Sequence, residues 1–169
     1  MILARFAIIC VLTFLLGHSM TALFYSQWLA AIVTLPGTFL HEGAHYLVSA
    51  LLDGRPEGFS VWPTFDANGN MDTLGHIYSH DNWYNDAAVG TAPLLLMPGT
   101  FALCALAART LNPLKIALFS WFAACAWLSS TPSPQDLSIH YPQSWFVAIP
   151  FLLVVTYLTY RWTRALLKV

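Results

Sequence analysis

A cluster of ionisable residues lies in the middle of an apolar stretch. The motif is His41-Glu42-Gly43-Ala44-His45, and the surrounding run from about Gln27 to Leu52 has the composition of a membrane helix. Ionisable groups within such a segment are costly and usually serve a function. On a helix, residues four positions apart share a face, so both imidazoles can bind one metal ion. Glu42 lies about 100° around the helix from His41, close enough to act on a water molecule at that metal. The motif is typical of zinc hydrolases.

The composition indicates an integral membrane protein. Of the 169 residues, 57% are apolar and only 9% are charged, whereas soluble domains average about 25% charged residues. The net charge of -1 argues against a nucleic-acid partner. We therefore expect a multi-pass protein in contact with the lipid bilayer, such as a bacterial cytoplasmic membrane. Residues 1–169 would form a single membrane-embedded domain, with its core at 27–140.

Five hydrophobic segments predict an all-α polytopic membrane protein with about five transmembrane segments. They cover residues 2–24, 27–52, 87–108, 114–128 and 144–167. The fourth is short for a full crossing. The first also resembles a signal peptide, but the apolar character resumes at once after it, which favours a retained span.

Two polar stretches separate these segments. Residues 53–86 contain turn residues between short alternating pieces, which predicts a β-hairpin around Asn68-Gly69. Residues 129–143 are rich in serine and proline. Five crossings would place both stretches on one side of the membrane, together with the N-terminus and Arg5. The positive-inside rule makes the other side cytoplasmic, because most of the basic residues lie there, but Arg5 opposes this orientation. These basic residues are Arg109, Lys115, Arg161, Arg164 and Lys168.

A catalytic zinc site needs a third protein ligand besides His41 and His45. A further histidine six residues after His45 would indicate the metzincin class, but that position is Leu51. The main candidates are Asp136, Asp86, His76, His80, Asp81 and His140. We favour Asp136, because it follows two prolines, and irregular backbone at membrane depth is tolerated where it is buried in protein or lines a cavity. The alternative is that Asp136 only caps a helix that starts at Leu137.

These residues together resemble the site-2-protease-type intramembrane zinc metalloproteases. The motif helix from His41 to Gly54, the hairpin-like stretch after it, Gly90-Thr91-Ala92-Pro93 and the segment Ser129–Asp136 are similar to that family's successive elements. The resemblance covers about residues 36–137 and describes a minimal version without a PDZ domain. It implies His41, His45 and Asp136 as zinc ligands and Glu42 as the catalytic base.

Two positions depart from the family pattern. The family usually has Asn where Ser129 or Ser130 stands, and Gly where Leu137 follows the ligand Asp. These departures concern the positioning of substrate more than the binding of metal.

The function expected from the sequence is an intramembrane zinc metallopeptidase. It would hydrolyse a peptide bond in a membrane-associated or transmembrane substrate, with Zn²⁺ as cofactor. One alternative is a membrane protein that binds zinc without catalysis, for binding or assembly. Another is a metal-dependent membrane enzyme or transporter of a different class, for which His76 and His80 would be a weak second ligand pair.

Overall fold

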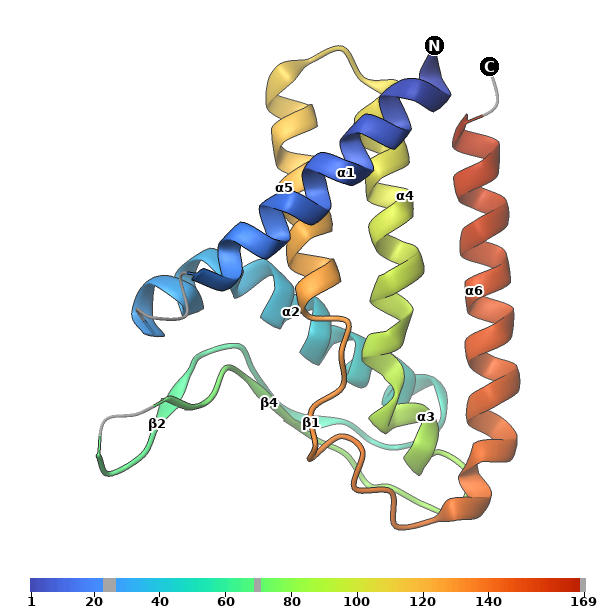
Figure 1. Cartoon of the computed structure of the whole chain (residues 1–169). Coiled ribbons are helices and arrows are strands. Elements are labelled where there is room, and N and C mark those ends of the chain that lie inside the picture. The colour runs from blue at the N-terminus through green and yellow to red at the C-terminus, as the bar shows by residue number, and fades with distance from the viewer. Residues whose placement is uncertain (23–26, 69–70, 168–169) are drawn as a thin grey trace.

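Helices make up most of the chain, in the order that the hydrophobic segments predict (Figure 1). The computed structural model describes residues 1–22, 27–68 and 71–167. The longer helices are α1 (Ile2–Thr21), α2 (Gln27–Leu51), α4 (Leu96–Arg109), α5 (Pro113–Leu128) and α6 (Trp145–Leu167). The short helices are α3 (Asp86–Gly90), η2 (Ala92–Leu95) and η3 (Pro142–Ser144). The predicted helical fold is confirmed, although residues 23–24 of the first predicted segment lie outside the described residues.

Three helical stretches are long and apolar enough to cross a membrane. They are Ile2–Met20, Ala92–Arg109 and Pro142–Leu167. Helix α5 is apolar but shorter, and α2, which contains the polar motif, is not among the three. The expected number of about five spans is therefore not confirmed by length and composition.

Small side chains line the contacts between the central helices. On α4, Cys104, Ala107 and Ala108 are fully buried, and Ala123 of α5 packs in the same cluster with Ile9 and Cys10 of α1. Small residues at such positions let helix backbones approach closely, which is the usual way in which helices associate in lipid. The outward faces of α1 and α6 carry exposed large apolar residues, as expected for helices that contact lipid.

The start of α1 and the end of α6 lie at the same end of the bundle, away from the strands (Figure 1). The Arg5 Nη2 atom donates a hydrogen bond to the carbonyl oxygen of Thr110 at 2.5 Å, and Arg109 Nη1 donates to that of Leu166 at 3.0 Å. The expectation that the N-terminus lies with the polar stretches is therefore wrong. Counting crossings fails because α2 runs obliquely across the lower half of the bundle and does not return the chain to the far end (Figure 1).

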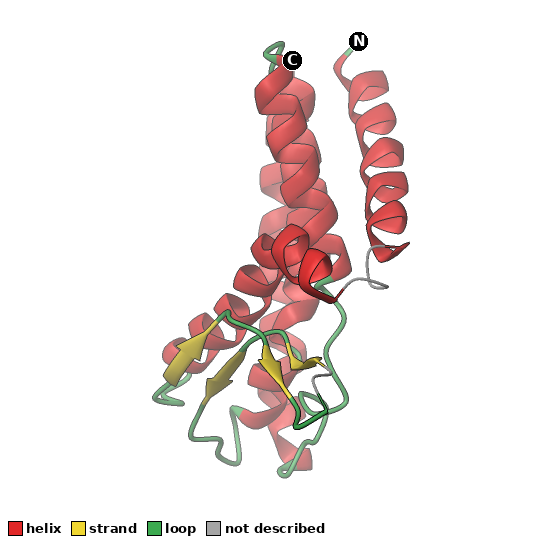
Figure 2. Cartoon of the chain, turned by 90° about the vertical axis from the view of Figure 1, so that its left-hand side faces the viewer, coloured by secondary structure: helices red, strands yellow, loops and turns green. Residues whose placement is uncertain are grey.

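The loop between α2 and α3 forms the predicted β-hairpin (Figure 2). Its strands are β1 (Glu57–Ser60), β2 (Thr64–Phe65), β3 (Met71–Thr73) and β4 (His76–Tyr78). The strands β1 and β4 pair in antiparallel fashion, as do β2 and β3 closer to the tip. These pairings confirm a β-hairpin in this loop. Its predicted turn at Asn68-Gly69 includes Gly69, which lies outside the described residues.

Aromatic contacts attach this hairpin to α2 at two places. The Phe65 ring stacks on Trp28 with 4.7 Å between ring centroids. On β1, the Phe59 ring lies 5.8 Å from that of Phe39 and 6.0 Å from that of Tyr46, measured between ring centroids. Each such pair contributes about 0.5–1.5 kcal/mol beyond its burial. The hairpin is thereby held along the helix that carries the polar motif.

Candidate metal centre

The two histidines of the motif are oriented by backbone carbonyl groups. His41 Nδ1 lies 2.7 Å from the carbonyl oxygen of Ser129, and His45 Nδ1 lies 2.7 Å from that of Val89. A carbonyl oxygen only accepts hydrogen bonds, so the hydrogen of each neutral ring sits on Nδ1. Each Nε2 atom then presents a lone pair, which is the arrangement by which proteins orient metal-binding histidines.

The two Nε2 atoms meet the carboxylate of Asp136. They lie 3.3 Å from each other. His41 Nε2 is 3.3 Å from Asp136 Oδ2, and His45 Nε2 is 3.4 Å from Asp136 Oδ1. Three electron-pair donors at these distances repel one another unless a proton or a metal ion lies between them. Within the described residues, His41, His45 and Asp136 form the group that could hold a metal ion.

The segment after α5 brings Asp136 to this position through a tight turn. Asp136 Oδ2 accepts a hydrogen bond from the Ser133 amide at 2.6 Å, and the Asp136 amide donates to Ser133 Oγ at 3.1 Å. No helix starts at Leu137 in the described chain, so the alternative of a helix cap is wrong. Burial by itself would raise the pKa of the Asp136 carboxyl, but the interactions with His41 and His45 outweigh it and hold this pKa well below its usual range.

Two glycines permit the close backbone contacts that assemble the centre. A Cβ atom at Gly90 would overlap the carbonyl oxygen of Asp136 and lie 3.1 Å from Ile139 Cδ1. A Cβ atom at Gly37, one turn before His41, would overlap Ser129 Oγ and lie 2.8 Å from the Cys125 carbonyl oxygen. Only glycine lets α2 reach the end of α5, and only glycine lets α3 reach the turn that carries Asp136.

We expect Gly90→Ala to weaken metal binding about 10- to 100-fold, the range seen when the supports of metal ligands are changed. The added methyl group must push the Asp136 backbone away from the two histidines. Gly99→Ala is the matched control, because a Cβ atom at Gly99 in α4 meets nothing within 4 Å. Competition with a metal-sensitive dye measures both affinities, and equal values for the two variants would contradict this role of Gly90.

Glu42 lies beside the three ligand candidates and is covered by the hairpin. Glu42 is 8% exposed, and it lies within electrostatic range of His41, His45 and Asp136. A Cβ atom at Gly75, just before β4, would come within 2.9 Å of Glu42 Cγ. The chain therefore crosses directly over the acid of the motif, which leaves Glu42 in a protected position next to the possible metal.

The other candidate ligands lie elsewhere. Asp86 is buried and accepts a hydrogen bond from the Tyr141 amide at 2.7 Å, which ties the segment after α5 to α3. Asp81 accepts one from Ser79 Oγ at 2.7 Å. The exposed His80 faces Glu57, with 3.9 Å between Nε2 and Oε1. His140 is exposed in its loop. His76, on β4, is within electrostatic range of Glu42 but is not part of the group of three.

The partners of the two histidines could not be predicted from the sequence. The carbonyl groups of Ser129 and Val89 belong to the backbone, so their side chains give no signal of this role. The close contacts of Gly37 and Gly90 had a partial signal, because isolated glycines in or next to apolar helices often mark a close approach of another backbone.

Comparisons with protein-family models, curated proteins and solved structures find no match to this chain. The similarity to site-2-protease-type enzymes therefore rests on the motifs alone and remains an interpretation.

Proposed function

We propose that the protein is an intramembrane zinc metallopeptidase. The observation that carries this proposal is the convergence of two oriented imidazoles and one carboxylate beside a buried glutamate. Such a set supplies three ligands, leaves a fourth position open for water or substrate, and adds an acid–base group. A site with a purely structural ion would use all four positions and would not need Glu42.

The spacing of the ligand atoms favours zinc among the possible metals. Ligands about 2.0–2.1 Å from a tetrahedral zinc ion lie about 3.3–3.4 Å from one another. The two Nε2 atoms lie 3.3 Å apart, which is close to that spacing, and each lies 3.3–3.4 Å from a different oxygen of the Asp136 carboxylate. Two imidazoles with one carboxylate also match the ligand types of catalytic zinc sites, whereas Ca²⁺ and Mg²⁺ prefer oxygen ligands.

The residues around the centre then support hydrolysis of an amide bond. When bound, the zinc ion would polarise the scissile carbonyl group and make water more acidic. Glu42 takes the proton from the attacking water and passes it to the leaving amine. The hairpin over Glu42 limits the access of bulk water, so the charges of the site act at a low effective dielectric constant.

The distribution of charge supports a multi-pass protein whose site opens away from the cytoplasm. All eight acidic residues lie between positions 42 and 136. Of the seven basic residues, only Arg55 lies within residues 42–108, and the other six come before or after that stretch. Arg5 contacts the α4–α5 turn, and so no longer opposes the other basic residues. By the positive-inside rule, the end with Arg5 and Arg109 is cytoplasmic, and the metal centre lies toward the opposite side.

We expect removal of zinc to abolish peptide cleavage, and stoichiometric zinc to restore it. The purified protein, reconstituted in lipid nanodiscs, is incubated with dye-labelled single-span peptides that carry helix-breaking residues at different depths. Products are read by mass spectrometry before treatment with 1,10-phenanthroline, after it, and after zinc is returned. Cleavage that continues without metal, or a protein that takes up no zinc at all, would contradict the proposal.

A further inference from the structure

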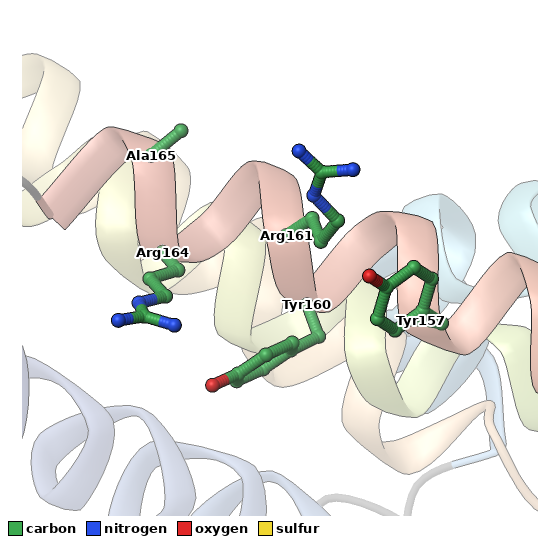
Figure 3. A pocket seen from close by; sticks show the side chains of 5 residues that line it. All are labelled: Tyr157, Tyr160, Arg161, Arg164 and Ala165. Carbon is green, nitrogen blue, oxygen red and sulfur yellow. The ribbon is translucent and has the colours of Figure 1, made fainter.

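A second cluster of functional groups lies at the opposite end of the molecule, on the last turns of α6. Tyr157, Tyr160, Arg161, Arg164 and Ala165 line a shallow cavity of about 340 Å³ (Figure 3). Residues three and four positions apart on a helix are neighbours on one face. Figure 3 shows the side chain of Arg161 on one edge of this face and those of Tyr160 and Arg164 on the other, so the cavity lies between them. The volume is about ten times the share of one water molecule, which is sufficient for a phosphate group.

The two arginines of this cavity differ in their contacts from the other arginines at this end of the bundle. Arg5 and Arg109, at the same end of the bundle, each donate to a backbone carbonyl oxygen. In contrast, Arg161 and Arg164 have no ion-pair or hydrogen-bond partner among the residues that the structure describes. No acidic side chain occurs after Asp136 in the sequence. Guanidinium groups are the preferred binders of phosphate oxygens in proteins, because they donate two parallel hydrogen bonds.

The position of the cavity selects a lipid phosphate over a free one. Arg161 and Arg164 lie in the last two turns of the stretch Pro142–Leu167, which is long and apolar enough to cross a membrane. Tyr157 and Tyr160 are each 57% exposed, as are tyrosines in the interfacial belts of membrane proteins. Toward the middle of the helix, Leu153, Val154 and Leu158 continue as exposed apolar surface, along which an acyl chain can lie.

We propose that this cavity binds the phosphate group of an anionic phospholipid in the cytoplasmic leaflet. The guanidinium groups of Arg161 and Arg164 hold the phosphate oxygens, and the hydroxyl groups of Tyr157 and Tyr160 donate further hydrogen bonds. The inference rests on the membrane location given under the proposed function, but it requires neither a bound metal nor peptidase activity.

The test is a titration of the purified full-length chain in detergent with phosphatidylglycerol and, separately, with phosphatidylcholine. Native mass spectrometry counts the bound lipids. We expect one retained phosphatidylglycerol, bound about tenfold more tightly than phosphatidylcholine. Arg161→Gln and Arg164→Gln should each lower this affinity at least about fivefold, since one basic side chain at an anionic membrane surface contributes about that factor. A Tyr157→Phe/Tyr160→Phe double variant should lower the affinity for phosphatidylglycerol further than either single Tyr→Phe variant does.

Lys115→Gln is the matched control, because Lys115 is exposed at the same end of the bundle but lies outside the cavity. Equal losses in all three charge variants would mean diffuse attraction to the surface and would overturn the site. Displacement of the lipid by millimolar inorganic phosphate would overturn the choice of a lipid ligand. Circular dichroism of each variant establishes that the helices are intact. Because no metal or substrate enters this measurement, its failure leaves the metallopeptidase proposal unaffected.

Discussion

Glu42→Gln should reduce the turnover of a cleavable peptide about 10²- to 10⁴-fold, the usual contribution of a general base. The amide of glutamine has almost the same shape as the carboxylate but cannot accept the proton of the attacking water. The three proposed ligands are untouched, so zinc content should remain at one ion per chain. Single-turnover cleavage and elemental analysis of the same preparation measure the two effects separately.

Glu57→Gln provides the matched control for this change. Glu57 is the other glutamate of the chain, lies on β1 of the hairpin, and is exposed to solvent. We expect its replacement to leave turnover within about twofold, since exposed surface substitutions seldom alter the fold. A Glu42→Gln protein that cleaves as fast as the wild type would remove the catalytic role. The centre would then be better described as a zinc-binding site without catalysis.

Asp136→Ala should lower the affinity for zinc by more than about 100-fold. Replacing a residue that only orients a metal ligand costs up to about 100-fold, and Asp136 is itself a proposed ligand. The variant leaves two imidazoles at 3.3 Å from each other without the carboxylate that completes the set. Zinc should therefore raise the melting temperature of the wild type but not that of the variant, because a ligand stabilises the state that binds it. Thermal scans with and without added zinc measure this difference.

Two further variants separate the loss of a ligand from damage to the fold. Asp136→Asn keeps the volume and an acceptor for the Ser133 amide, but its oxygen is neutral, so the zinc-induced shift should still be lost. Asp81→Ala removes an exposed carboxylate that the sequence left open as a ligand, and should keep the full shift. Zinc that remains bound in both Asp136 variants would place the third ligand elsewhere and would undercut the resemblance to site-2-protease-type enzymes.

Segment boundaries could be predicted closely from the hydrophobic pattern. The segments expected at 27–52, 114–128 and 144–167 correspond to α2, α5 and α6 within one residue at each end. The segment at 87–108 is broken into α3, η2 and α4 around Pro93, which lacks the amide hydrogen that an uninterrupted helix would need. The direction of α2 could not be predicted, because counting crossings treats every long apolar helix as a complete span.

The metal centre could be predicted in part, because the spacing of its two histidines is a local feature of the sequence. Two histidines four positions apart must share a helix face, whatever the rest of the fold does. Asp136 is distant in sequence, and its selection depended on the prolines before it. Its actual position depends on the close contact with Gly90 and on the turn closed by Ser133. Such contacts arise only from tertiary packing, which no local pattern encodes.

The carbonyl groups that hold the two histidines have a consequence for how this centre tolerates mutation. A hydrogen bond to a backbone oxygen is independent of the side chain at that position, so Val89 can be exchanged for another apolar residue of similar size without releasing His45. Position 129 is restricted to small residues only because its side chain faces Gly37. A mutational scan would therefore find few sensitive positions around the ligands themselves. The sensitive ones would be glycines, at which the loss of activity comes from an added methyl group and not from a missing functional group.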